Sequence, residues 1–285
     1  MPSYRLLTSP MTGQLAELFG ECRRSIFLTA PYVNEFGVTA LMSAVRAAPA
    51  EISLKVLTSI QVQSLQKGSL DIASLITLCE HFPRATVASL PRLHAKVYVV
   101  DDAKAVISSA NLTRGGLVDN YEYGILIRDR RVVLGIVEDM DGYSGLGSQF
   151  TLESLRDIAP DVSRLRALDA QADRRQKASQ SGRALSLTAS ALQGKLLANR
   201  VRTRTINSIF AETIRYVLGL APMTTEQLHS RIKDIHPDIC DDTMDRVIRG
   251  QRFGKLWKHH VRNAQQFLKR RGEIELRQGG WQLIE

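Results

Sequence analysis

The sequence is poor in cysteine and has no long apolar run, and each of these shortages excludes a class of protein. Its three cysteines, Cys22, Cys79 and Cys240, follow no paired spacing, so we expect reduced thiols rather than a disulfide framework or a zinc site. No run of about 18 or more apolar residues could cross a membrane. The opening MPSYRLLTSP lacks the basic and then apolar layout of a secretory signal. We therefore expect a cytoplasmic protein with no membrane partner.

The formal net charge of +9 comes from the second part of the chain. Residues 1–170 carry 17 Lys and Arg against 18 Asp and Glu, whereas residues 171–285 carry 21 against 11. This asymmetry favours a polyanionic partner that is bound mainly by the second part. A solvated basic face is the alternative interpretation. The length of 285 residues, with 44% hydrophobic and 24% charged residues, is typical of a globular chain of two domains.

Strand and helix patterns alternate over residues 1–170, which predicts an α/β domain with a mixed β-sheet flanked by helices. Period-two or short apolar runs predict strands at residues 4–8, 25–30, 51–57, 86–90, 93–99, 105–107 and 121–127. Helical spacing of apolar residues predicts helices at residues 12–23, 36–47, 70–81 and 130–143.

The most informative stretch is RLHAKVYVVDDAKAVISSAN, residues 92–111. His94 and Lys96 lie two residues apart in an alternating run, so a strand would place both side chains on one face. A second strand then leads to Ser109 and Asn111. An imidazole can attack phosphorus or carry a proton, and an amine and an amide can hold charge on phosphoryl oxygens. The alternative, a buried strand that merely contains His and Lys, conflicts with the rarity of buried, unpaired lysine.

This pattern resembles the HxKxxxxD…GSxN motif of the phospholipase D superfamily. The matching positions are His94, Lys96, Asp101, Ser109 and Asn111, with Asp101 as a structural position, and Ser108 stands where the family usually has Gly. The resemblance implies one phospholipase D-like unit. It also implies a phosphodiesterase that forms a phosphohistidine intermediate and needs no metal or other cofactor.

Only one HxK occurs in the chain, whereas the family chemistry uses two histidines. The resemblance therefore implies a homodimer with one site on its twofold axis, to which each subunit contributes His94, Lys96, Asn111 and Glu122. One His94 would attack phosphorus, and the second would act as general acid and then as base for water. In the nuclease branch of the superfamily, a Glu near the position of Glu122 orients the catalytic His. An exposed acid at the end of a strand is the alternative for Glu122.

Residues 171–205 carry eight basic residues and one acid among Ser, Ala and Gln, which predicts a basic linker or arm. A helix within residues 185–197 is conceivable. We hypothesise that such an arm gates the site or guides the substrate.

Residues 206–285 are predicted to be mainly helical, with helices at 206–220, 224–235, 243–249 and 255–271 and a hairpin at 273–284. This order resembles a winged-helix domain. Nine Lys and Arg and no acid lie between residues 246 and 272, which favours contact with duplex DNA. The expected DNA-binding residues are Arg252, Lys255, Lys258, His259, Arg262, Lys269 and Arg270. Protein docking or dimerisation is the alternative for this domain.

Together these features predict a metal-independent DNA endonuclease of the phospholipase D superfamily, with a catalytic and dimerisation domain at 1–170, a linker at 171–205 and a DNA-binding domain at 206–285. A sequence-specific, restriction-type enzyme is the preferred form, because indiscriminate cutting needs no separate binding domain. The alternatives are a nonspecific or repair-type nuclease of the same superfamily, a lipid-acting member, and a catalytically idle DNA-binding regulator.

Overall fold

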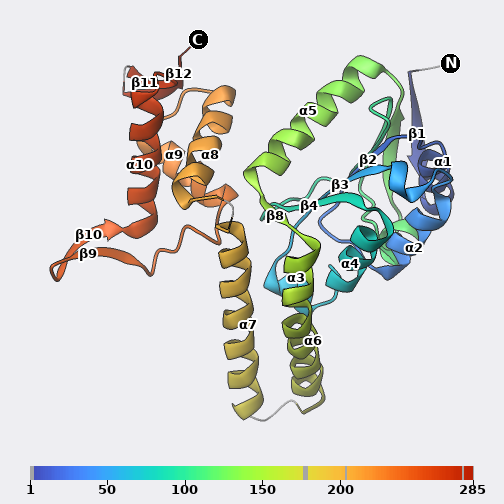
Figure 1. Cartoon of the computed structure of the whole chain (residues 1–285), viewed down its shortest axis with the longest axis horizontal. Coiled ribbons are helices and arrows are strands. Elements are labelled where there is room, and N and C mark those ends of the chain that lie inside the picture. The colour runs from blue at the N-terminus through green and yellow to red at the C-terminus, as the bar shows by residue number, and fades with distance from the viewer. Residues whose placement is uncertain (1–2, 176–178, 203, 278, 285) are drawn as a thin grey trace. The chain divides into compact units, whose positions relative to one another are not determined.

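A computed structural model describes residues 3–175, 179–202, 204–277 and 279–284 (Figure 1). The chain forms two compact units, which we call unit 1 (Met1–Asn199) and unit 2 (Arg200–Glu285).

Unit 1 is built on a mixed sheet, in which the described strands follow the order β1-β7-β6-β5-β2-β3-β4-β8. Strands β2, β3 and β4 are parallel to one another, and the remaining neighbours are antiparallel. The strand bounds are β1 Tyr4–Thr8, β2 Ser25–Thr29, β3 Ser53–Thr58, β4 Arg84–Ser89, β5 Val97–Val100, β6 Lys104–Ser108, β7 Tyr123–Ile127 and β8 Ser148–Phe150. The predicted α/β fold with a mixed sheet is confirmed.

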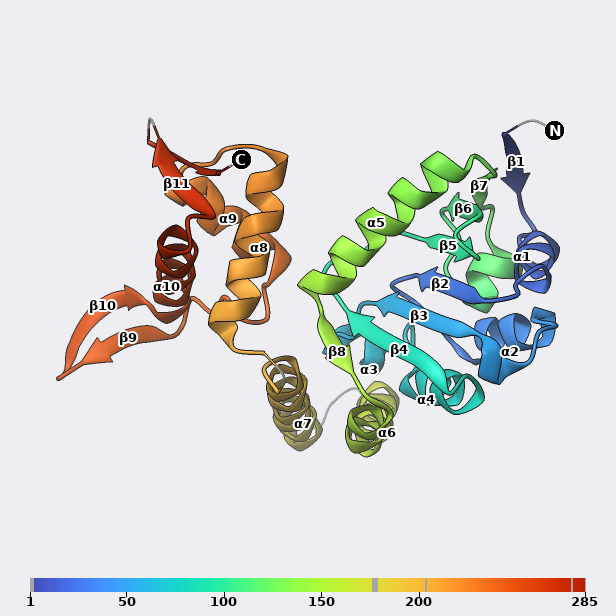
Figure 2. The ribbon, with the colours of Figure 1, turned by 45° about the horizontal axis from the view of Figure 1, so that its top comes forward.

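Helices cover both faces of this sheet. Figure 2 shows α5 crossing one face, and α1, α2 and α4 lying against the other. Bounds are α1 Thr12–Gly20, α2 Glu35–Ala44, η1 Pro49–Glu51, α3 Val62–Gln66, α4 Ile72–His81, η2 Gly115–Asp119, α5 Arg130–Leu146, α6 Leu152–Arg175 and α7 Ser179–Arg200. Side-chain caps start several of them: for example, Asn34 accepts from the amide of Gly37 at α2, Asp71 from Ser74 at α4, and Asp129 from Arg131 at α5.

The core of unit 1 lies between the sheet and the α1–α2–α4 layer. Alternate residues of the central strands point into it, among them Leu28 of β2 and Tyr98 of β5, which are fully buried. Phe19 of α1 packs edge-on against the Tyr98 ring, with 6.0 Å between ring centroids. The Tyr98 hydroxyl donates to the carbonyl oxygen of Ala110 at 2.7 Å, so the core directly supports the turn that follows β6.

The stretch predicted as a basic linker, residues 171–205, is largely helical where it is described. Helix α6 continues to Arg175 and α7 covers Ser179–Arg200, while residues 176–178 lie outside the described residues. Leu192 of α7 is fully buried in the core of unit 1, and Lys195 pairs with Asp161 of α6 at 2.5 Å. Leucines and alanines at helical spacing therefore give α7 an apolar side, although the segment as a whole is basic.

Unit 2 consists of three helices and two short hairpins within the described residues. Bounds are α8 Ile206–Leu220, α9 Thr225–Ile235, β9 Asp245–Ile248, β10 Gln251–Lys255, α10 Leu256–Arg270, β11 Ile274–Arg277 and β12 Gly280–Leu283. Thr224 and Gln227 form a capping box at the start of α9. Met223 bridges to Trp281 of β12, so the C-terminal hairpin packs beside the α8–α9 connection. The predicted helices at 206–220, 224–235 and 255–271 and the C-terminal hairpin are confirmed.

The helix predicted at residues 243–249 is wrong, because this segment is the first strand of the β9–β10 hairpin. Val247 and Ile248 are β-branched, and they precede Arg249-Gly250, which both have positive φ, 50° and 81°, as in a two-residue hairpin turn. In so short a segment the apolar spacing does not distinguish the two structures, and the turn decides the outcome.

Arg200, the first residue of unit 2, lies at the centre of a buried polar network within that unit. The Arg200 side chain, 2% exposed, donates to Nδ1 of His236 and to the Asp238 carboxylate. Because Nδ1 accepts, Nε2 carries the proton and donates to Oγ1 of Thr213 at 2.5 Å. That hydroxyl in turn donates to the carbonyl oxygen of Ile209 at 2.9 Å. Burial, with the nearby Arg200 and Arg204 charges, holds the pKa of His236 well below its usual value.

Candidate active site

The candidate site lies at one end of the sheet, where three antiparallel strands meet. Val97 at the start of β5 pairs with Ile107 near the end of β6, and Ser108 pairs with Gly124 near the start of β7. The carboxyl ends of the parallel strands point the same way, since Thr29 of β2 pairs with Val97. Ligands of open α/β sheets bind at this end. The chain segments before β5, after β6 and before β7 are thereby brought together.

His94 and Lys96 lie just before β5, because the strand begins at Val97 rather than at residue 93 as predicted. Nζ of Lys96 is 3.2 Å from both His94 ring nitrogens and donates to the His94 carbonyl oxygen at 2.8 Å. His94 is exposed, whereas Lys96 is 6% exposed. The Lys96 ammonium therefore lies directly beside the imidazole, the group that could attack phosphorus.

Lys96 is the residue of this site whose electrostatics are most altered. Burial lowers its pKa, and the negative charge of Glu122 partly opposes that shift. The Glu122 carboxylate is therefore close enough to influence the protonation of Lys96.

Asp101 occupies the turn after β5, away from His94, with a positive φ of 55°. Its carboxylate accepts hydrogen bonds from the backbone amides of Arg23 at 2.9 Å, Arg24 at 2.7 Å and Ser25 at 2.9 Å. Asp101 thus ties the β5–β6 turn to the start of β2. This contact explains why the motif needs a carboxylate at a distance from the reacting groups.

Asn111 is held by close packing of its backbone. A Cβ at Gly116 would stand 2.3 Å from the Asn111 carbonyl oxygen and 2.6 Å from its amide nitrogen. On the other side, a Cβ at Gly37 would stand 2.1 Å from the Leu112 carbonyl oxygen. The Asn111 Oδ1 is buried and has no hydrogen-bond partner among the described residues. A buried acceptor without a partner, at the turn that follows β6, is suited to a ligand that brings a hydrogen-bond donor.

Ser109 and Glu122 form a hydrogen-bonded pair at the rim. The Ser109 hydroxyl donates to the Glu122 carboxylate, and Nδ2 of Asn120 donates to the same group at 3.1 Å. The Tyr123 amide donates to Oγ of Ser109 at 3.1 Å. The contacts described for the Glu122 carboxylate are therefore with Ser109 and Asn120, and none is with His94 of the same chain. Whether Glu122 orients a histidine remains a prediction.

Ser9 is a further residue of the site, and the sequence analysis missed it. Its hydroxyl donates to the Asn120 carbonyl oxygen at 2.8 Å and accepts from the Glu122 amide at 2.5 Å. The two segments are more than a hundred residues apart in the chain, so no local pattern indicates the contact. Ser9 fixes the backbone that carries Glu122.

An apolar patch is exposed on the sheet beside the site. Tyr4 and Leu6 of β1, Ile107 of β6 and Tyr123 of β7 lie on one face by their strand register and are all exposed. Tyr121, next to Glu122, is fully exposed. Contiguous exposed apolar side chains are typical of interaction surfaces.

The residues predicted to bind DNA all belong to unit 2. Arg252 lies on β10, and Lys255 immediately precedes α10, where it pairs with Asp245 at 2.8 Å. The remaining five are on α10: Lys258, His259, Arg262, Lys269 and Arg270. Helical spacing places them on the side opposite the buried Trp257, Val261 and Leu268. Helix α10 therefore presents a basic face.

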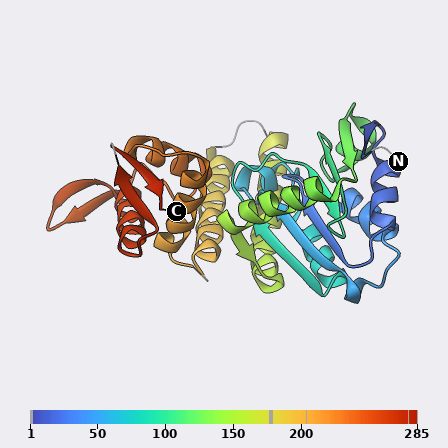
Figure 3. The same cartoon turned by 90° about the horizontal axis from the view of Figure 1, so that it is seen from above.

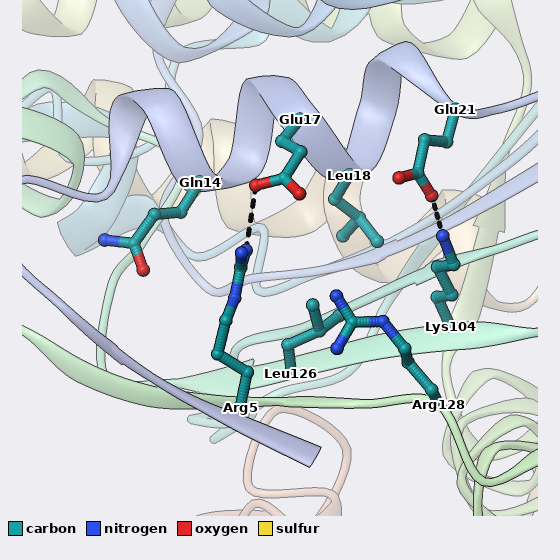
Figure 4. A pocket seen from close by; sticks show the side chains of 8 residues that line it. All are labelled: Arg5, Gln14, Glu17, Leu18, Glu21, Lys104, Leu126 and Arg128. Carbon is teal, nitrogen blue, oxygen red and sulfur yellow. Dashed lines mark hydrogen bonds and ion pairs between the residues drawn. The ribbon is translucent and has the colours of Figure 1, made fainter. Parts of the chain in front are cut away.

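A separate crevice of unit 1, lined by charged residues of β1, α1, β6 and β7, is almost filled by ion pairs. In the crevice of Figure 4, Arg5 pairs with Glu17 and Lys104 pairs with Glu21, which leaves a space of about 10 Å³, roughly that of one water molecule. Across the described ranges, no three His, Cys, Asp or Glu side chains are grouped as metal ligands would be. No helix in the described part of the chain has the length and apolar character that a bilayer crossing requires.

Comparison with known proteins agrees with this arrangement. Residues 15–143 match the family model described as cardiolipin synthase, PLD-like domain. A segment of 42 residues is 48% identical to the DISARM protein DrmC of Bacillus paralicheniformis and covers 15% of this chain and 18% of that protein. The match thus spans about a fifth of the relative's length.

Two solved structures are similar to part of this chain. Nuc, a phospholipase D family member from Salmonella typhimurium, has 17% identity and a TM-score of 0.44, over 53% of this chain and 99% of Nuc. NucT from Helicobacter pylori has 16% identity and a TM-score of 0.41, over 49% of this chain and 94% of NucT. The family-model match includes the segments that carry His94, Lys96, Asn111 and Glu122, so residues 15–143 are similar to a phospholipase D-like domain.

Proposed function

We propose that this protein is a DNA endonuclease that hydrolyses phosphodiester bonds through a phosphohistidine, without a metal ion. The observation that carries the proposal is the contact of Lys96 with both the ring and the carbonyl oxygen of His94. It sets a donor-only cation beside an exposed imidazole, as attack on an anionic phosphodiester requires. The NH2 group of the Asn111 side chain would add a second donor for the phosphoryl oxygens.

The reaction needs a second acid–base group, which we assign to His94 of the partner subunit. A ring nitrogen of one His94 bonds to phosphorus while one P–O ester bond breaks, and His94 of the partner subunit gives that oxygen its proton. That second imidazole then takes a proton from water, whose oxygen bonds to phosphorus as the P–N bond breaks. The exposed patch of Tyr4, Leu6 and Tyr123 beside the site supports a contact with a second copy.

Unit 2 supplies the DNA-binding surface in this proposal. Its three helices and C-terminal hairpin suit a winged-helix-like domain, with α10 as the helix that enters the major groove. The basic face of α10 would contact phosphates and base edges. A separate binding unit favours a sequence-specific, restriction-type enzyme over an indiscriminate one.

The test is to incubate the full chain with plasmid and linear duplex DNA in excess EDTA. We expect discrete fragments and a denaturant-stable, acid-labile adduct between labelled DNA and the protein. His94→Ala should abolish both and retain DNA binding. A smear would indicate a nonspecific nuclease, and binding without cutting would indicate a regulator. Cleavage that needs a divalent cation, survives His94→Ala or comes from a monomer would overturn the mechanism.

A further inference from the structure

The β9–β10 hairpin, Asp245–Lys255, is a free-standing ribbon whose strands pair only with each other. It extends from the rest of unit 2 in all three views, most clearly in Figure 3, where it is the dark-orange hairpin at the end of the ribbon drawing. Its base is tied to α10. Nε2 of His259 donates to the Phe253 carbonyl oxygen at 2.6 Å, and Arg246 donates to Nδ1 of the same ring at 3.0 Å.

The ribbon has large apolar side chains that are exposed to solvent. Val247 is 56% exposed, Phe253 46% and Ile248 42%. A two-stranded hairpin has no core of its own and is only marginally stable without packing. Apolar side chains on such an element are therefore available to a partner.

The charges on the ribbon favour a negatively charged partner. Asp245 is its one acid, and the Asp245 carboxylate already pairs with Lys255 at 2.8 Å and Arg252 at 3.5 Å on one face. By strand alternation the opposite face carries Arg246 and Ile248, with no acid. Arg249 lies at the tip. Because its one acid is already paired, the ribbon as a whole carries an excess of arginine beside exposed aliphatic side chains on both faces. Such a ribbon is complementary to a polyanion with apolar base edges.

The turn supports the same conclusion. Arg249 has a φ of 50°, in a position where Asn or Gly is normally preferred. A β-branched or long side chain in that conformation is disfavoured. The chain therefore has an arginine at the tip at some conformational cost, which suggests that the guanidinium is used there.

We propose that the β9–β10 ribbon is a second DNA-binding element of unit 2, which inserts its arginine tip into a groove of duplex DNA. A two-stranded ribbon fits the major groove, and its aliphatic side chains can contact thymine methyl groups while Arg249 and Arg252 contact phosphates or guanine. The ribbon inference rests on the proposed DNA-binding role of unit 2, and it assigns to that role an element beyond α10.

The test measures affinity for a fluorescent 30-base-pair duplex, with all variants in a His94→Ala background and in EDTA. The main variant is Arg249→Asn with Arg252→Gln. Asn-Gly is the preferred hairpin turn, so this change removes two charges while strengthening the turn. The matched control is Arg130→Gln with Arg131→Gln, which removes two charges from the exposed start of α5. We expect the ribbon variant to bind about tenfold more weakly and to lower the slope of log K against log salt by about 1–2. The control should stay within about twofold.

A second variant, Val247→Thr with Ile248→Thr, keeps β-branched residues and removes apolar surface. It should weaken binding about threefold with an unchanged salt slope, since no charge is lost. A third variant, Lys258→Gln with Arg262→Gln and Lys269→Gln, tests α10 alone.

Normal binding by both ribbon variants, with weak binding by the α10 variant, would overturn the ribbon inference and leave the proposed function intact. Failure of the parent protein to bind any duplex would overturn both. Normal DNA binding with an altered oligomeric state in the ribbon variants would show instead that the ribbon docks a protein.

Discussion

The hydroxyl of Ser109 donates to the carboxylate of Glu122 and accepts from the backbone amide of Tyr123. The same hydroxyl therefore also fixes the start of β7. The carboxylate is thus held by side chains of its own chain, and its charge acts on Lys96, whose pKa burial lowers and Glu122 raises. Glu122 therefore helps to keep Lys96 protonated.

The first prediction concerns this charge. Glu122→Gln keeps the shape of the side chain but replaces one accepting oxygen by an NH2 group and removes the charge that raises the pKa of Lys96. A protonated Lys96 is required in our mechanism, so the loss of cleavage at alkaline pH should begin at a lower pH in the variant. At the optimum, kcat should fall by up to about a hundredfold, because the Ser109 contact is also weakened.

The measurement is a pH profile of kcat/KM for cleavage of one duplex. Asp102→Asn, at an exposed turn position, removes one charge without touching the site and serves as the control. An alkaline limb that stays in place, or moves to higher pH, would contradict the assigned influence of Glu122 on Lys96.

The second prediction concerns the packing of Asn111. Gly116→Ala places a methyl group against the Asn111 backbone, which should displace this residue and cost about 1–3 kcal/mol of unfolding free energy. Cleavage should fall more than the stability loss explains. Gly142→Ala in α5 meets no neighbour within 4 Å, so it should stabilise by about 0.5–1 kcal/mol and leave cleavage unchanged. Urea unfolding and single-turnover cleavage measure both. Equal behaviour of the two variants would refute this account.

The third prediction concerns Asp101, which we expect to stabilise the fold without taking part in the reaction. Asp101→Ala removes the acceptor shared by the amides of Arg23, Arg24 and Ser25, which should destabilise unit 1 by about 2–4 kcal/mol. The folded fraction should nevertheless cleave within about threefold of the parent rate, since Asp101 lies away from His94. Denaturant titration and cleavage at a temperature where the variant is folded give the two values. A large loss of kcat in fully folded protein would instead make Asp101 part of the chemistry.

The fourth prediction concerns acid stability. The pKa of His236 is depressed in the folded protein, so the unfolded chain binds the additional proton below about pH 6.5. Stability should therefore be fully present above that pH and fall by about 1.4 kcal/mol per pH unit below it. His229 and His260, whose pKa values are also lowered by burial, act in the same direction. His236→Gln should be less stable at pH 7.5 and should show a smaller slope between pH 6.5 and 5. An unchanged slope would contradict the buried neutral state.

Much of the fold could be predicted from the sequence, because local signals agree with the final structure. The alternating and helical patterns of unit 1 predicted most of its strands and helices, and the HxK motif located the segments that the sheet brings together. The roles of His94, Lys96, Ser109, Asn111 and Glu122 stay predictions, as do the domain boundaries.

The remainder depends on contacts that no local pattern contains. Ser9 meets the Glu122 backbone only after β1 pairs with β7, and Gly116 matters only because Asn111 packs against it. The β9–β10 ribbon was missed because four residues do not distinguish a strand from a helical turn. Helix α7 was expected only over residues 185–197, because the basic composition of the rest of the segment indicated a linker. Its packing depends on Leu192, which is buried in the core.

The place of Arg200 has a practical consequence for anyone who wishes to produce unit 2 by itself. A fragment that begins at residue 206, where composition suggests a natural start, would leave the ring nitrogen of His236 without its donor and Asp238 without its counter-ion. Such a fragment should be poorly soluble and prone to proteolysis, whereas one that starts a turn or two before residue 200 should behave as an independent folding unit. Truncations that test the proposed DNA binding of unit 2 should therefore begin upstream of that arginine.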